Sequence, residues 1–255
     1  MAKAPKTAYV CNDCGAEFSR WQGQCSACKA WNTISEVRLI SASNSTKNDR
    51  FSGYAGETRA KIQTLSEISL QETPRFTSGF KELDRVLGGG IVPGSAILIG
   101  GHPGAGKSTL LLQVMCGLAK NMTALYVTGE ESLQQVAMRA NRLNLPTDKL
   151  NMLSETSVEQ ICNLADQLKP QIIVVDSIQV MHLSDIQSSP GSVAQVRECA
   201  SFLTRYAKTR QVAIIMVGHV TKDGTLAGPK VLEHAIDCSL LLEGEADSRF
   251  RTSRS

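Results

Sequence analysis

From about residue 75 onward, short aliphatic runs alternate with longer segments whose apolar residues recur every three or four positions. The short runs are typical of strands buried in a parallel sheet, and the longer spacing is typical of helices that cover such a sheet. The pattern predicts strands at 95–101, 123–129, 150–154, 171–177, 212–219 and 236–244. It predicts helices at 106–120, 132–143, 157–169 and 193–210. This alternation predicts an α/β fold with a mostly parallel sheet flanked by helices.

Two of the predicted helices begin with residues that are typical of helix N-termini. Ser132 stands where its hydroxyl could cap the helix at 132–143. Thr156 is followed three residues later by Glu159, which is the spacing of a capping box for the helix at 157–169.

The first forty residues lack this pattern and carry four cysteines in two C-x-x-C pairs, ten residues apart. Two such pairs on facing turns give a closed tetrahedral thiolate site, which suits structural zinc. The pattern therefore predicts a zinc-ribbon module whose ligands are Cys11, Cys14, Cys25 and Cys28. An iron–sulfur cluster stays open as an alternative, and the βαβ context of a thioredoxin-like redox pair is missing.

The other cysteines and the two tryptophans are expected to be structural. We expect Trp21 and Trp31 to pack over the zinc site or to form the small core of its module. Four cysteines have no ligand spacing and are predicted to be small buried apolar residues. They are Cys116, Cys162, Cys199 and Cys238.

Composition indicates where the domain boundaries of the chain lie and in which cellular compartment it acts. Residues 41–60 are rich in Ser, Asn, Thr and Gly, so we predict a zinc module at 1–40, a flexible linker at 41–62 and the α/β domain at 63–255. Residues 1–50 hold seven basic and four acidic residues, so the net charge of +3 lies there. The chain shows no signal peptide and no apolar stretch that could span a membrane, which predicts a cytoplasmic protein.

The strongest motif is "GHPGAGKS" at 101–108, between a predicted strand and a predicted helix, which matches the P-loop pattern. The glycines let backbone N–H groups and the helix N-terminus surround phosphates. Lys107 would reach the β- and γ-phosphates of ATP, and Ser108 would bind Mg²⁺. The predicted ATP-binding residues are Gly101, His102, Pro103, Gly104, Ala105, Gly106, Lys107, Ser108 and Thr109.

Three further polar residues follow predicted strands. Asp176 ends an aliphatic strand and would hold Mg²⁺, usually through water. Glu130 is favoured over Glu131 as the catalytic base that activates water. His219 ends the strand at 212–219, where it would be either a sensor of the γ-phosphate or an ordinary loop histidine.

These motifs together resemble the bacterial RadA (Sms) DNA-repair family, a branch of the RecA-like ATPases. The resemblance covers the whole chain in order. It rests on "WQGQCSACKAW", "FTSGFKELDRVLGGGIVPGSAILIGG", the P-loop, "YVTGEESLQQVAMRA", "IVVDSIQVM", "SSPGSVAQVRE" and "GHVTKDGTLAGPKVLEH".

The resemblance implies an ATP-dependent motor that binds single-stranded and branched DNA and promotes branch migration in homologous recombination. It also implies a homo-hexamer, with a recombinase or helicase as a further protein partner, and ATP, Mg²⁺ and Zn²⁺ as cofactors. The segment at 220–230 corresponds to one that faces DNA in RecA-like proteins, which makes Lys222 and Lys230 candidate phosphate contacts.

One departure from the family is at the end of the chain. Family members continue into a Lys-Asn-Arg-Phe-Gly motif and a domain similar to the Lon protease, whereas this sequence stops at Ser255. We expect a truncated form, with "CSLLLEG" and "SRFRTSR" as the arms of a shortened hairpin, and this puts its motor activity in question.

Two other functions stay open. One is a nucleotide-switched binding or signalling module whose ATPase is slow and indifferent to DNA. The other is a protein-interaction adaptor in which the zinc module does the binding, because such modules bind nucleic acid or protein about equally well.

Overall fold

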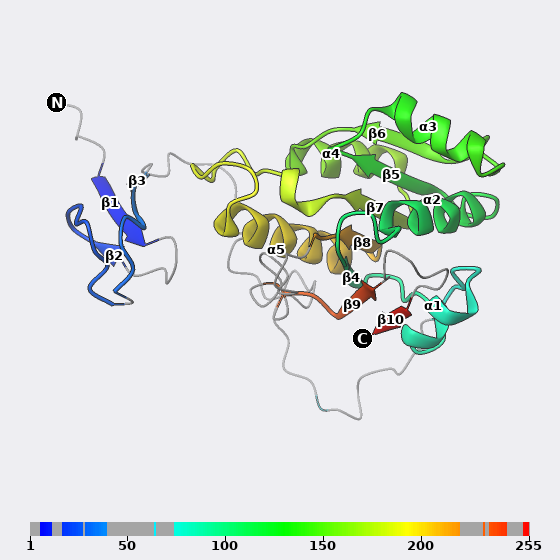
Figure 1. Cartoon of the computed structure of the whole chain (residues 1–255), viewed down its shortest axis with the longest axis horizontal. Helices are drawn as coiled ribbons and strands as arrows, with labels where there is room; N and C mark the ends of the chain where they lie inside the picture. Colours follow the sequence, from blue (N-terminus) through cyan, green and yellow to red (C-terminus); the bar gives the residue numbers. More distant parts are fainter. Residues whose placement is uncertain are drawn as a thin grey trace. The chain divides into compact units, whose positions relative to one another are not determined.

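The computed structural model (Figure 1) describes residues 6–11, 17–27, 29–39, 64, 74–219, 232, 235–243 and 252–254. The chain divides into two compact units, 1–51 and 52–255. In the described part of the chain we find no helix that is both long enough and apolar enough to cross a membrane.

The unit at 1–51 is built on a small antiparallel sheet. Its strands are β1 (Lys6–Cys11), β2 (Glu17–Phe18) and β3 (Ile34–Leu39), in the order β2-β1-β3. Cys11 lies opposite Ile34 in the register of β1 and β3. These two residues and Cys25 form a buried cluster, against which Tyr9 and Phe18 pack.

The two tryptophans lie outside this cluster. The side chains of Trp21 and Trp31 are 58% and 68% exposed. The expectation that they form the core of the module was therefore wrong, because the buried cluster is made by the cysteines and Ile34 with Tyr9 and Phe18 around them.

The unit at 52–255 contains a seven-stranded sheet, as far as the structure describes it. Its strands are β4 (Ala96–Gly100), β5 (Ala124–Thr128), β6 (Asn151–Ser154), β7 (Ile172–Asp176), β8 (Ala213–Val217), β9 (Cys238–Glu243) and β10 (Thr252–Arg254). The order is β10-β9-β4-β8-β7-β5-β6. All described pairings are parallel except that of β9 with β10, which is antiparallel, and this confirms the mostly parallel sheet.

Helices cover both faces of this sheet (Figure 1). They are α1 (Lys81–Val86), α2 (Lys107–Leu118), α3 (Leu133–Arg142), α4 (Val158–Leu168) and α5 (Val193–Arg210), with a short 3-10 helix at Ile178–Val180. Helices α1, α2 and α3 pack in the apolar cluster of one face. Helices α4 and α5 pack in the cluster of the other face.

The four cysteines without ligand spacing lie in this unit. Cys116, Cys162 and Cys199 are buried on helices, which confirms their predicted role as small apolar residues. Cys238, at the start of β9, is half-buried.

One of the two predicted helix caps is correct. Ser132 accepts a hydrogen bond from the backbone N–H of Gln135 and forms a complete capping box with it. The capping box predicted from Thr156 was wrong, because the N-cap of α4 is Ser157 and its hydroxyl accepts from Gln160. The carboxylate of Glu159 instead accepts hydrogen bonds from Ser184, at 2.8 Å from both its backbone nitrogen and its hydroxyl.

The order of the strands determines where the candidate site forms. Strands β4, β8, β7 and β5 are neighbours, and their carboxyl ends lie at the same edge of the sheet. The P-loop follows β4, His219 follows β8, Asp176 ends β7 and Glu130 follows β5. Ligands of open α/β sheets bind outside the carboxyl ends of the strands, so this edge is where a nucleotide would lie.

Candidate nucleotide and metal sites

The P-loop is a close turn from β4 into α2. Gly104 and Gly106 have φ angles of 81° and 95°, which favour glycine, and Gly106 is the N-cap of α2. A Cβ atom on Gly101 would lie 2.4 Å from the carbonyl oxygen of Leu242, so only glycine fits between the loop and β9. His102 is exposed, in agreement with a variable position of the motif.

The ammonium of Lys107 points back into this loop. Its Nζ donates hydrogen bonds to the carbonyl oxygens of Gly101, at 2.7 Å, and His102, at 3.0 Å. Burial lowers the pKa of Lys107, and the negative charges of Asp176 and Glu130 oppose that effect. The lysine therefore lies within the electrostatic field of both predicted acids, so the structure brings these three residues together.

Asp176 is buried at the end of β7, and the hydroxyl of Tyr126 donates a hydrogen bond of 2.6 Å to its Oδ2. Tyr126 is fully buried, and its burial together with the charge of Asp176 raises the tyrosine pKa far above its usual range. Tyr126 therefore stays a hydrogen-bond donor that orients this carboxylate. Asp176 is a buried carboxylate and Ser108 is a hydroxyl residue in the first turn of α2, and both offer the oxygen ligands that Mg²⁺ prefers.

Glu130 lies in a hydrogen-bonded group between β5, β7 and β8. Its Oε1 accepts a hydrogen bond from the hydroxyl of Ser177 and lies 3.3 Å from Nε2 of His219. The backbone N–H of Gly129 donates to the carbonyl oxygen of Asp176 at 2.9 Å, which keeps the two loops together. The hydrogen bond from His219 lowers the pKa of Glu130, and Ser177 and Lys107 add to this effect against the opposing burial. Glu130 is thus a carboxylate at neutral pH.

Glu131 points to a different partner. Its carboxylate forms an ion pair with Arg139 of α3. Its backbone is held by Thr128, whose hydroxyl donates to the carbonyl oxygen of Glu131 at 2.7 Å. Of the two neighbouring acids, only Glu130 contributes charge at Lys107.

His219 is linked to the loop after β7. The side-chain amide of Gln179 donates to the carbonyl oxygen of His219 at 3.4 Å. Within the described part of the chain, Nδ1 of His219 and Oε1 of Gln179 are buried without a hydrogen-bond partner. His219 contacts Glu130 and Gln179 contacts His219, so these two unpaired atoms could bind water or a ligand near this group.

Sequence reasoning missed four residues of this site, which are Tyr126, Arg139, Ser177 and Gln179. The sequence did carry a signal for Tyr126. It lies two positions before Thr128 in the same strand, so its side chain points to the same face of the sheet as that of Thr128. Ser177 directly follows Asp176 and could have been considered as a polar neighbour. Arg139 and Gln179 reach the site only through the packing of α3 and of the short helix after β7, which no local pattern reveals.

The two predicted DNA contacts, Lys222 and Lys230, lie outside the described residues.

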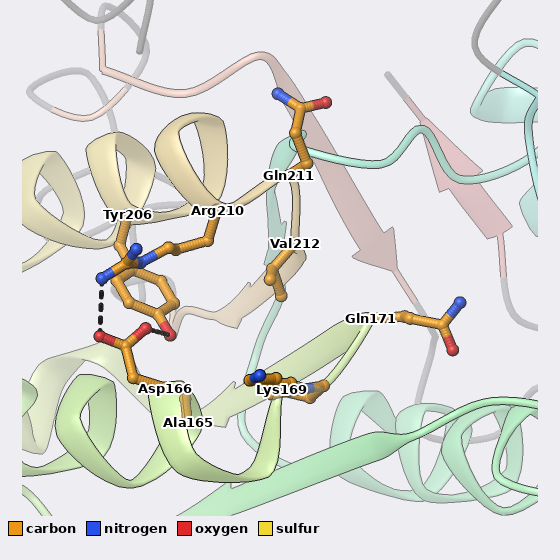
Figure 2. Close-up of a pocket in the computed structure, with 9 residues that line it drawn as sticks. Ala165, Asp166, Lys169, Gln171, Tyr206, Arg210, Gln211 and Val212 are labelled. Carbon is orange, nitrogen blue, oxygen red and sulfur yellow. Dashed lines mark hydrogen bonds and ion pairs between the residues drawn. The ribbon is translucent and has the colours of Figure 1, made fainter. Parts of the chain in front are cut away.

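The hollow in Figure 2 lies beside the amino ends of the strands, opposite the edge where the candidate nucleotide site forms. Gln171 and Val212 line it and directly precede β7 and β8. Asp166 of α4 pairs with Arg210 of α5 at 2.8 Å and accepts a hydrogen bond of 2.9 Å from the hydroxyl of Tyr206. These contacts tie the ends of α4 and α5 together, so we interpret the hollow as structural.

The candidate zinc site is described at two of its four cysteines. Cys11 and Cys25, one from each C-x-x-C pair, are 1% and 0% exposed and lie in one buried cluster. Sγ of Cys11 also lies 3.2 Å from the hydroxyl oxygen of Thr33. Cys14 and Cys28 lie outside the described residues. Two thiols from separate pairs that meet in one small core fit a four-thiolate metal centre.

Two family models match the chain. A model described as an AAA domain matches residues 61–225, and one described as a rubredoxin metal binding domain matches residues 9–36. The first contains the whole nucleotide site, and the second contains all four cysteines of the candidate zinc site.

Curated relatives match over the whole chain. Proteins named DNA repair protein RadA are 94% identical in Haemophilus influenzae, 73% in Escherichia coli and 45% in Bacillus subtilis. Each match covers 100% of this chain, which spans 56%, 56% and 55% of those relatives.

Among solved structures, the KaiC-like protein PH0186 from Pyrococcus horikoshii is similar in fold, with a TM-score of 0.58 at 17% identity. The match covers 71% of this chain and 86% of that one. It supports the RecA-like P-loop fold of the second unit. The chain belongs to the AAA domain family, and over its whole length it is a homologue of the proteins named DNA repair protein RadA.

Proposed function

We propose that the chain binds and hydrolyses ATP with Mg²⁺ and that this ATPase acts on DNA in recombination and repair. The observation that carries the proposal is the meeting of Lys107, Asp176 and Glu130 at one edge of the sheet, beside the P-loop. The name of the relatives, DNA repair protein RadA, supports DNA repair as the setting. A bacterial cytoplasmic location is part of the proposal.

The residues of the site divide the work of phosphoryl transfer. When ATP binds, Lys107 exchanges the carbonyl oxygens of Gly101 and His102 for the β- and γ-phosphates. Ser108 and Asp176 would hold Mg²⁺, which neutralises charge on the phosphate oxygens when bound. Tyr126 keeps the Asp176 carboxylate in its orientation through the hydrogen bond of 2.6 Å.

Glu130 is the proposed base. Like an ordinary glutamate it is ionised at neutral pH, and its lowered pKa keeps it in the carboxylate form that can accept a proton from a water molecule attacking the γ-phosphate. Ser177 and His219 hold this carboxylate in place. His219 is also the proposed γ-phosphate sensor, since its Nδ1 is buried without a partner among the described residues and could respond to a new neighbour.

The action on DNA rests on the relatives. We propose that the complete protein binds single-stranded and branched DNA and promotes branch migration as a homo-hexamer, with a recombinase or helicase as partner. Lys222 and Lys230 are the proposed DNA contacts. This chain spans 56% of its Haemophilus and Escherichia relatives, so motor activity is proposed for the complete protein, and ATP binding and hydrolysis are proposed for this chain.

The test is Mg²⁺-dependent ATP hydrolysis by the chain with and without single-stranded DNA. We expect DNA to stimulate turnover and salt to weaken the stimulation, because salt competes with contacts to phosphate. The substitution Lys107→Ala should lower turnover by about a hundredfold or more. Lys120→Ala, at an exposed position just after α2, is the matched control and should change nothing.

Two outcomes would contradict the proposal. Normal turnover in Lys107→Ala would refute the site. Slow turnover that DNA does not change, in this chain and in one extended by the rest of the protein, would favour the nucleotide-switched binding module instead.

A further inference from the structure

The chain's only two tryptophans are both on the surface of the unit at 1–51. Trp21 is 58% and Trp31 is 68% exposed, while the buried cluster of that unit contains only Cys11, Cys25 and Ile34 among the described residues. A unit of about fifty residues has room for only a small core, so it would gain stability by burying its largest apolar side chains. Their exposure therefore indicates a surface that binds something.

The two rings lie close together and are held in place. A Cβ atom built on Gly23 would lie 3.8 Å from Cη2 of Trp21 and 3.9 Å from Cζ3 of Trp31, so both rings flank this glycine. Nε1 of Trp21 donates a hydrogen bond of 3.2 Å to the carbonyl oxygen of Ile34. Trp31 is paired with Gln24 in an antiparallel bridge. We call Trp21 and Trp31 the tryptophan pair.

The sequence around the tryptophan pair is cationic and polar. Residues 18–35 contain no aspartate or glutamate, but they contain Arg20 and Lys29. Both cations are exposed, and neither forms an ion pair with another described residue. Gln22 and Asn32, next to the tryptophans in sequence, add amide groups that can donate and accept hydrogen bonds.

We infer that the tryptophan pair is a stacking surface for unpaired bases of single-stranded DNA, with Arg20 and Lys29 as contacts to its phosphates. Flat aromatic faces beside cations are the combination that binds single strands without regard to sequence. A protein partner would also use tryptophans, but between Glu17 and Glu36 the segment carries two exposed cations and no carboxylate, which favours a polyanion. The inference rests on the proposed function for DNA as the ligand, and adds where the DNA binds.

The test uses the zinc-loaded chain of 255 residues and an oligonucleotide of thymidines, without ATP. Because no other tryptophan exists, the emission of the chain reports on this surface alone. Stacked bases should quench it, with the same midpoint as binding measured by fluorescence anisotropy of labelled DNA. An abasic strand of equal length should bind more weakly and should not quench.

Variants separate stacking from folding. Trp21→Ala and Trp31→Ala should each weaken DNA binding by about fivefold or more, because stacking is lost. Trp21→Phe and Trp31→Phe should keep most of the affinity, and each leaves one tryptophan as reporter. Met138→Ala, at a 65% exposed position of the other unit, is the control and should bind as the parent does.

The inference is overturned if DNA binds without quenching the tryptophan emission. It is also overturned if the variant that carries both Trp21→Ala and Trp31→Ala binds DNA as tightly as Met138→Ala does. If DNA still stimulates ATP hydrolysis by that double variant, the proposed function is supported even when the inference about the tryptophan pair is overturned. The absence of both DNA binding and DNA stimulation in every form of the chain would overturn the inference and the proposed action on DNA together.

Discussion

Glu130 and Glu131 are adjacent in sequence but have different partners. Glu130 accepts from Ser177 and lies beside His219, whereas Glu131 pairs with Arg139. The ion pair holds the Glu131 carboxylate against Arg139 of α3. Glu130 is held by a hydroxyl and an imidazole near the P-loop lysine, so it can act on a substrate bound there.

This difference predicts opposite results for two matched substitutions. Glu130→Gln should lower ATP turnover by about a hundredfold or more while ATP binding stays, because the proton acceptor is lost. Glu131→Gln should keep turnover near that of the parent and lower stability by no more than about 1 kcal/mol, the usual value of a partly exposed ion pair. Single-turnover hydrolysis and nucleotide binding measure the two effects. The reverse ranking would make Glu131 the base.

The pH profile follows from the same residue. The pKa of Glu130 is lowered, so its carboxylate form is present above that pKa and is lost only as the pH falls through it. The acid limb of turnover should therefore lie below the range where an ordinary glutamate protonates, provided that the chain stays folded.

The sequence indicated the candidate catalytic and phosphate-binding residues of this site more readily than the residues that support them. The P-loop, Asp176 and Glu130 follow strands in a recognisable order, so local pattern was enough to choose them. Tyr126 reaches the site from a buried strand face and Gln179 from the short 3-10 helix at Ile178–Val180, so their roles depend on tertiary packing. Of the two alternatives for the tryptophans, the one in which they form the core of the module was wrong, because both side chains are largely exposed. Packing over the zinc site stays a prediction, and a module that gains folding free energy from a metal can leave aromatic rings exposed.

At the scale of elements, hydrophobic periodicity placed the helices and strands of the second unit closely. The helix predicted at 193–210 is α5, with the same bounds, and the one at 157–169 is α4 at Val158–Leu168. The N-terminus of α4, where the predicted capping residue was wrong, shows what residue spacing alone does not decide. Thr156 and Ser157 both fit a capping residue, and Glu159 suits a capping box with the first, but its carboxylate is used by Ser184.

The corrected cap gives a prediction for stability. Ser157→Ala should lower the free energy of unfolding by about 1 kcal/mol, because the N–H of Gln160 loses its acceptor. Thr156→Val is the matched control, since it keeps the shape and removes only the hydroxyl. It should be nearly neutral. Urea unfolding followed by helical circular dichroism measures both, and equal losses would show that Thr156 also caps α4.

At the scale of the whole molecule, the two units are stabilised in different ways. The unit at 52–255 buries two large apolar clusters, one on each face of its sheet. The unit at 1–51 buries three residues among those described, and two of these are proposed zinc ligands. A unit of about fifty residues has room for only a small apolar core, so we expect a bound metal to supply part of the free energy that offsets the entropy of ordering the chain.

Removal of zinc should therefore unfold one unit and spare the other. We expect a strong chelator to shift the tryptophan emission of the chain, because Trp21 and Trp31 both lie in the unit at 1–51. Helical circular dichroism and ATP binding should stay, since they report on the second unit. Cys25→Ser should reproduce the shift, and Cys116→Ser, which alters a buried cysteine of α2, is the control that should not. Metal analysis decides between zinc and iron. If ATP binding were lost together with the tryptophan signal, the P-loop unit would depend on the metal, and its own two apolar clusters would not be sufficient to hold it folded.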